Sequence, residues 1–317
     1  MQQMTNHSTV SEFLLLEFSD VWELQIIHFL LFLTWYLATV TGNLLIISVV
    51  VFDHSLHTPM YFFLLILAIL DIGSVSVIIP KSMTNSLLKT RVIPFSGCAA
   101  QVFLYVFFAV SDFFLLTIMA YDRYVAICNP LQYELVMNRQ ACLEMVASVW
   151  VCSLLLGMLH TIGTFATPFC SNVVNQFFCE IPQLLKLTCS GSHLTEIGAI
   201  ALAFALGVSC CTFIFVTYVL ILTVVLRMPS VQGRKKAFST CLPHLTIFSM
   251  MLVSGCFAYL KPPSNGPSPL GITMTIVYSM VPPLLNPVIY SMRNKELKLA
   301  LSKLFGVKNL ARKMSFS

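Results

Sequence analysis

A chain of 317 residues in which 57% are hydrophobic and 10% are charged cannot be an ordinary soluble domain, because such domains carry roughly 25% charged residues. Its mean hydropathy of +0.86 predicts a protein embedded in a lipid bilayer. The net charge of +5 suits an anionic lipid surface and gives no argument for nucleic acid.

Seven apolar stretches each reach the roughly 20 residues that a helix needs to cross a bilayer. They run over residues 25–51, 59–79, 97–127, 141–160, 196–226, 237–260 and 270–292. No long linker, repeat or low-complexity tract divides them. We therefore expect one all-α membrane domain over residues 1–317, a seven-transmembrane helix bundle over 25–292 with tails at 1–24 and 293–317.

The basic residues orient this bundle, because cytoplasmic loops carry an excess of Lys and Arg. Most of the 18 Lys and Arg residues fall on the side of the C-terminus. The exceptions are Lys81, Lys89, Arg91, Lys186 and Lys261. We therefore expect a plasma-membrane protein with an extracellular N-terminus and a cytoplasmic C-terminus.

The N-terminal tail fits this orientation. It holds acidic residues and no Lys or Arg, and Asn6-His7-Ser8 is an N-glycosylation sequon, which is used only on the lumenal side. No basic segment with an apolar core of about 7 to 15 residues precedes the first span. We expect that span to act as an uncleaved signal anchor.

Two acids, Asp71 and Asp112, lie inside the second and third stretches. A lone carboxylate at the centre of a membrane helix costs about 2.5 to 3.5 kcal/mol on insertion scales. No Lys or Arg lies at that depth, so a small cation is the natural counter-charge, with further oxygen ligands from Asn43, Asn286 or Thr117. The alternative is that one or both acids are protonated and hydrogen-bonded.

Asp122, Arg123 and Tyr124 close the third stretch. Charges at the end of a membrane helix cost free energy unless they pair or extend to the interface. The triplet therefore indicates either a functional site or a capping charge pair, and by itself it does not decide between them.

Four of the 11 cysteines, Cys98, Cys170, Cys179 and Cys189, lie on or near the outer side, where disulfides persist. Four cysteines allow three pairings, and free thiols are the alternative. The outer segment 161–195 holds three of them and is long enough to fold over the mouth of the bundle as a lid. The remaining cysteines lack the spacing of a metal site and are expected to pack as small apolar side chains.

The last stretch and the tail carry two further signals. Pro287 lies inside the seventh stretch, where its missing N–H removes a helical hydrogen bond and predicts a kink. Leu297, Leu301 and Leu304 recur at helical spacing among lysines within 295–305. This pattern predicts a short cytoplasmic amphipathic helix on the inner leaflet.

Five short motifs follow one another from the first stretch to the seventh. They are Gly42-Asn43, residues 56–64 (LHTPMYFFL), 119–128 (MAYDRYVAIC), 236–241 (KAFSTC) and 283–294 (PLLNPVIYSMRN). In this order and at these depths they resemble the odorant-receptor branch of the rhodopsin-like G-protein-coupled receptors. The chain departs from the family pattern at Pro243, where a serine usually precedes the histidine, and at Met251-Leu252-Val253, where Phe-Tyr-Gly is usual.

The resemblance implies a sodium ion at Asp71 and Asp112 that stabilises the resting state, and it implies the disulfides Cys98–Cys179 and Cys170–Cys189. It also implies a switch in which Arg123 first holds the resting state and then turns to the G protein. The residues of that switch are Asp122, Arg123, Tyr124, Tyr218, His244, Asn286, Pro287 and Tyr290. The alternatives are interface anchoring for the tyrosines of the fifth and seventh helices, and a satisfied core position or a titrating switch for His244.

The outer half of the bundle is expected to hold the ligand. Helical spacing places Tyr105, Val106 and Ala109 on one face of the third stretch. The resemblance adds Leu202, Leu206, Leu252, Gly255, Tyr259 and Ser279. Such a wall, mostly apolar with two phenols and a hydroxyl, suits a small neutral or weakly polar volatile molecule, although each residue can equally serve helix packing.

Other functions fit the sequence less well. A retinal pump needs a lysine in its seventh helix for the Schiff base, and residues 270–292 contain none. A transporter or channel would show inverted repeats or more charge along a pathway, and an enzyme would show a motif such as HExxH or GxSxG. Amine receptors, one rival beside lipid receptors, place an acid where this chain has Tyr105. We therefore expect an odorant receptor that catalyses no reaction and raises cAMP through a stimulatory heterotrimeric G protein.

Overall fold

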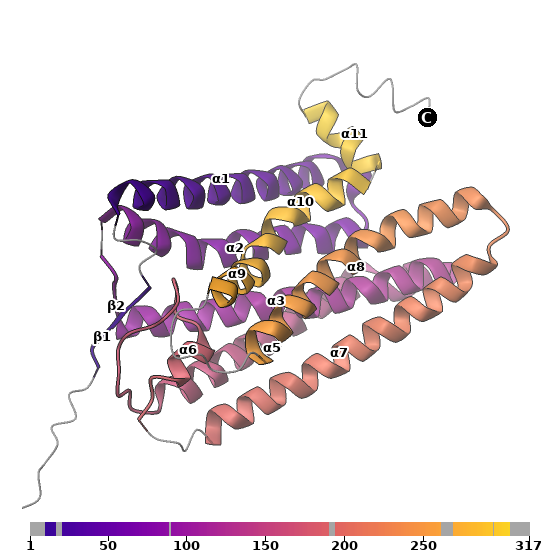
Figure 1. The fold of residues 1–317 in the computed structure, drawn as a ribbon. Helices are drawn as coiled ribbons and strands as arrows, with labels where there is room; N and C mark the ends of the chain where they lie inside the picture. Colours follow the sequence, from indigo (N-terminus) through magenta and orange to yellow (C-terminus); the bar gives the residue numbers. More distant parts are fainter. Residues whose placement is uncertain are drawn as a thin grey trace, which may run out of the picture.

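The computed structural model describes residues 10–16, 21–88, 90–189, 194–260, 269–293 and 295–304. Its long helices are α1 (Trp22–Phe52), α2 (Pro59–Leu88), α3 (Phe95–Cys128), α5 (Arg139–Phe165), α7 (Leu194–Arg227) and α8 (Val231–Leu260). Two shorter helices follow, α9 (Pro269–Ser279) and α10 (Val281–Arg293), and then α11 (Lys295–Leu304). The connections hold β1 (Glu12–Leu14), η1 (His54–Leu56), β2 (Val92–Pro94), η2 (Pro130–Gln132), α4 (Tyr133–Val136) and α6 (Ile181–Leu185). Figure 1 shows β1, β2 and α6 at one end of the bundle and α11 at the other.

Within the described ranges, six helices are long and apolar enough to cross a membrane, and α9 with α10 forms a bent seventh span. The predicted seven-helix membrane bundle is confirmed, and so is the short helix after it. In α11, Leu297 and Ala300 are buried against the bundle, while Lys303 lies 3.3 Å from Asp53 before η1. Hydrogen bonds from Ser55 hold the pKa of Asp53 below its ordinary value.

The break in the seventh span lies at Met280, seven residues before Pro287, where a kink is predicted. The axes of α9 and α10 differ by 45°, while Pro287 lies within the continuous helix α10. Pro282 and Pro283 both lack the N–H that would continue the hydrogen bonds of α9, but proline is tolerated in the first turn of a new helix. In α8 the helix likewise continues through a proline, Pro243, from Val231 to Leu260.

The end that carries β1 and β2 is closed by a lid, which we define as residues 166–189. The predicted disulfides Cys98–Cys179 and Cys170–Cys189 are both present, the first joining the lid to α3 and the second lying within the lid. Both pairings are therefore confirmed. The short helix α6 follows Cys179 in this segment.

The N-terminal tail contributes to the same cap, which the sequence analysis did not predict. β1 pairs antiparallel with β2, with Phe13 opposite Ile93, so the domain contains a small sheet in addition to its helices. Phe13 is 0% exposed, and its ring packs edge-on against Phe169 of the lid with the centroids 5.0 Å apart. Tail, lid and the start of α3 thus share one apolar cluster.

Candidate functional site

A charged cluster lies near the C-terminal end of α3, on the side of the bundle that carries α11. Arg123 donates to Asp122 Oδ2 through Nε, at 2.8 Å, and through Nη2. Tyr133 of α4 donates its hydroxyl to Asp122 Oδ1 at 2.7 Å. Burial and the Asp122 charge raise the pKa of Tyr133, so its phenol remains a donor. Both carboxylate oxygens are engaged, and the guanidinium is held against its own helix.

A buried histidine joins three helices at a similar depth. Nε2 of His244 in α8 lies 2.7 Å from the Leu116 carbonyl of α3, and Nδ1 lies 2.8 Å from the hydroxyl of Tyr218 in α7. Because a carbonyl only accepts, Nε2 carries a hydrogen, and the neutral ring accepts the Tyr218 hydroxyl at Nδ1. Tyr124 packs beside Tyr218 in an apolar cluster between α3, α7 and α8. His244 is therefore a fully hydrogen-bonded core residue in this conformation.

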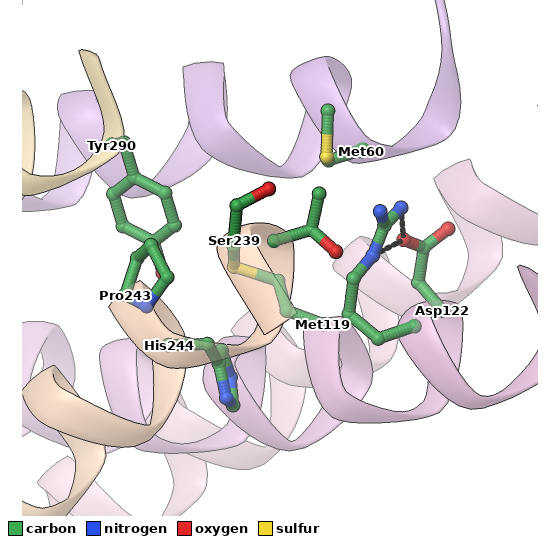
Figure 2. A pocket seen from close by; sticks show the side chains of 9 residues that line it. Met60, Met119, Asp122, Ser239, Pro243, His244 and Tyr290 are labelled. Carbon is green, nitrogen blue, oxygen red and sulfur yellow. Dashed lines mark hydrogen bonds and ion pairs between the residues drawn. The ribbon is translucent and has the colours of Figure 1, made fainter. Parts of the chain in front are cut away.

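A cavity opens between α2, α3, α8 and α10 beside these groups. Its lining consists of Met60, Met119, Asp122, Arg123, Ser239, Thr240, Pro243, His244 and Tyr290. Figure 2 shows Tyr290 and Pro243 on one side of it and Met60 and Asp122 on the other. The Tyr290 hydroxyl is buried and has no hydrogen-bond partner among the described residues, so this phenol is available for a new partner.

The two predicted intramembrane acids lie in different surroundings. Asp71 accepts from Asn286 Nδ2 through both carboxylate oxygens, at 3.1 and 2.9 Å. Asp112 Oδ1 and Asn286 Oδ1 are buried without a partner in the described part of the chain. The described residues contain no cluster of three or more His, Cys, Asp or Glu side chains suited to a metal. The donor set is made of oxygens, which fits a hard monovalent cation rather than a transition metal.

The Gly42-Asn43 motif of α1 supports the proline of α10. Pro287 cannot donate to the Pro283 carbonyl one turn earlier, and Asn43 Nδ2 donates to that carbonyl instead, at 3.0 Å. A Cβ on Gly42 would lie 3.2 Å from Pro287 Cγ, so glycine permits the close approach. α10 thus keeps its helical path through Pro287 because a neighbouring helix satisfies the freed carbonyl.

The predicted ligand wall is only partly assembled. The Tyr105 ring lies 5.3 Å from Phe178 of the lid and 6.5 Å from Tyr278 of α9, centroid to centroid. Ser279, next to Tyr278, is buried and donates to the Thr275 carbonyl of its own helix. Tyr105 and Ser279 therefore belong to one region, where α3, α9 and the lid meet.

The other predicted wall residues are more scattered. Val106 is buried in the apolar cluster under the lid, and Ala109 is half-buried. Leu252 packs towards Phe248, Leu206 is half-buried, and Gly255 has open space where a Cβ would lie. Leu202 is 46% exposed. The side chain of Tyr259 and the whole of Asn6 lie outside the described residues.

Comparison with known proteins places this geometry in a family. The family model for olfactory receptors matches residues 32–308. Human olfactory receptor 14C36 is 47% identical over 302 residues, which cover 95% of this chain and 97% of that receptor. Human olfactory receptor 14L1 is 46% identical over 302 residues, covering 95% and 93% of the two chains. The chain belongs to the olfactory receptor family. As an olfactory receptor it is a signalling protein of the G-protein-coupled class and not an enzyme.

The fold of this olfactory receptor is also found in a solved structure. The crystal structure of squid rhodopsin superposes with a TM-score of 0.71 at 20% identity, over 91% of this chain and 87% of that one. At this identity the likeness concerns the fold alone. It agrees with the seven spans and the helix that follows them.

Two features of the receptor were missed in the sequence analysis. In the lid, Glu180 is 5% exposed and accepts hydrogen bonds from Tyr278 and Gln176. Between α5 and α7, His160 Nδ1 lies 2.9 Å from Glu196 Oε1, and Glu196 is fully buried. Glu180 lies within the predicted outer segment 161–195, and Glu196 begins the fifth predicted stretch, so the charge of each resembled that of an ordinary exposed loop residue.

Proposed function

We propose that a small volatile odorant binds in the lid half of the bundle and activates a stimulatory heterotrimeric G protein, which raises cAMP. In this proposal the receptor lies in the plasma membrane, with the lid and a glycosylated Asn6 outside and α11 against the inner leaflet. The excess of Lys and Arg on the α11 side supports this orientation. The observation that carries the proposal is the cavity on the α11 side of the bundle, which is lined by Arg123 and by Tyr290 with its unpaired hydroxyl.

The exposed surface beside the cavity supports a cytoplasmic protein partner. Leu131 of η2 is 100% exposed, and Leu135 of α4 is 77% exposed. Both lie close in sequence to Tyr133, which holds Asp122 and through it Arg123. Apolar side chains displayed around a charged cavity are suited to be buried by a docking protein.

The contacts of His244 suggest how the two ends are coupled. An outward movement of α8 would break the hydrogen bond from His244 to the Leu116 carbonyl and widen the cavity. Arg123 could then leave Asp122 for the G protein, and the free Tyr290 hydroxyl could move towards Tyr218. In this mechanism α10 moves at Asn286 and Pro287. The hydrogen bond from Asn286 to Asp71 couples this movement to α2.

We further propose a sodium ion at Asp71, Asp112 and Asn286, which would stabilise the resting state. The two unpartnered oxygens of Asp112 and Asn286 support it. Asp112→Asn should remove the dependence of basal nucleotide exchange on sodium, measured by replacing NaCl with KCl at constant ionic strength. A variant that keeps the wild-type salt response would exclude Asp112 as a ligand.

The function is tested with receptor in lipid nanodiscs, a library of volatile molecules and purified heterotrimers of the stimulatory and inhibitory classes. Agonist-dependent nucleotide exchange is expected on the stimulatory class only. Arg123→Ala should abolish it, whereas Arg139→Ala, an exposed arginine at the start of α5, should not. Full exchange with Arg123→Ala, or solute flux through the purified protein without exchange, would contradict the proposal.

A further inference from the structure

A carboxylate is buried at the mouth of the bundle. Glu180 directly follows Cys179, whose disulfide to Cys98 fixes this part of the lid on α3. Glu180 is 5% exposed, and Phe177 and Phe178 before it are fully buried. The lid therefore carries this acid into the bundle instead of leaving it on the surface.

The close partners of Glu180 are neutral. Tyr278 donates to its Oε1, and Gln176 Nε2 donates to its Oε2 at 3.2 Å and to Thr275 Oγ1 at 2.9 Å. Lys186 of the lid acts on the carboxylate only at longer range. No Lys, Arg or His of the described ranges lies within ion-pair distance of it.

Burial without a contacting cation makes this carboxylate receptive to a donor. Loss of hydration raises the pKa of Glu180, because the charged form is the one that burial disfavours. A carboxylate has about four lone-pair sites, and side-chain hydrogen bonds from Tyr278, Gln176 and Thr275 occupy three of them, which leaves one for a further donor. An incoming N–H or O–H group would therefore form a charge-assisted hydrogen bond in a dry environment, where such bonds are strong.

Glu180 also lies beside the proposed odorant site. Tyr278, which donates to it, has its ring 6.5 Å from that of Tyr105, and Tyr105 contacts Phe178. The carboxylate is thus separated from the predicted ligand wall by one phenol. An apolar wall that ends at an acceptor selects for molecules with a matching donor.

We infer that Glu180 is the polar anchor of the odorant site, and that agonists donate a hydrogen bond to it as alcohols or protonated amines, whereas carboxylic acids are rejected. The inference rests on the proposed odorant function and names its ligand class. Acids are rejected because their anions would lie against a buried charge of the same sign. Ethers of the same shape offer no donor.

Probes that share a carbon skeleton and differ in one group separate these cases. The set is an alcohol, an amine, a methyl ether and a carboxylic acid, each on linear, branched, cyclic and aromatic skeletons. Potency is read as nucleotide exchange on the G protein. The alcohol or the amine should exceed its ether by tenfold or more, as expected for a hydrogen bond to a charged group. Selective response to alcohols would assign a neutral donor, and selective response to amines a cation.

Ethers or acids as potent as their alcohols and amines would overturn the inference while leaving the odorant function intact. If no volatile in this set or in the wider library activates exchange, the proposed function fails and the inference fails with it. The two failures are therefore distinguishable in one assay.

Two variants assign the effect to Glu180. Glu180→Gln should lower the potency of donor probes at least tenfold and leave that of ethers unchanged, while Glu144→Gln, on the exposed face of α5, should change neither. If Glu180→Gln does not reach the cell surface, Tyr278→Phe decides. It frees an acceptor site on Oε1 and keeps the ring, so the ratio of donor to ether potency should rise severalfold. An unchanged ratio would overturn the inference.

Discussion

Replacement of Asn43 by alanine should destabilise the receptor through a single backbone carbonyl. The Asn43 amide donates to the carbonyls of Thr39 and Pro283, each at 3.0 Å. The Thr39 carbonyl lies within α1 and keeps its helical partner. The Pro283 carbonyl has no such partner, because the residue one turn later is Pro287.

The expected loss follows from that asymmetry. Asn43 is 1% exposed, so its removal leaves the Pro283 carbonyl buried without a donor. A buried polar group left unpaired costs about 1 to 3 kcal/mol. We expect the free energy of unfolding to fall by about this amount in Asn43→Ala.

A double-mutant cycle isolates the carbonyl from the other effects of the substitution. Pro287→Ala restores an N–H that can bond to the Pro283 carbonyl, so Asn43→Ala should cost much less in that background. Unfolding of detergent-solubilised receptor can be followed by labelling of the buried thiols of Cys142 and Cys241. Equal costs of Asn43→Ala in the two backgrounds would refute this account of how α10 tolerates its proline.

Two further predictions concern polar contacts. His160→Ala should lower stability by about 3 to 5 kcal/mol, because Glu196 would remain buried without its partner, whereas Lys303→Ala, which removes an exposed ion pair, should cost at most about 1 kcal/mol. Similar losses for both in thermal unfolding would contradict the assigned burial. Tyr133→Phe removes one of the bonds that hold Asp122 and should raise basal nucleotide exchange severalfold at unchanged surface expression. Basal exchange equal to that of the wild type would show that this hydroxyl does not restrain the resting state.

The break in the seventh span illustrates what reasoning from single residues does not reveal. Pro287 predicts a kink on the ground that one hydrogen bond is lost, but a neighbouring helix replaces that bond through Asn43. The break occurs instead where Pro282 and Pro283 together remove two donors and a new helix can begin. A motif interpreted helix by helix cannot reveal this, because the compensating donor comes from α1.

The polar partners of the predicted ligand region also come from distant elements. Helical spacing grouped Tyr105, Val106 and Ala109, but Val106 packs under the lid, while the polar partners of that region, Glu180 and Tyr278, come from the lid and α9. A single acid after a cysteine in a loop belongs to no helical or strand periodicity, so the sequence pattern does not predict that Glu180 is buried. Its burial depends on the disulfide and on how far the lid enters the mouth.

The sequence by itself determined the seven spans, the helix after them, the family and the ionic triplet, because hydropathy over about 20 residues and short ordered motifs are local properties of the chain. The tertiary structure decided which carbonyls and acids find partners. It placed Asn43 under Pro283, Tyr133 on Asp122, His160 on Glu196 and Glu180 inside the mouth. In each case the free energy of a buried polar group depends on a donor or acceptor from a distant element, and only the packing of the helices and the lid brings the two together.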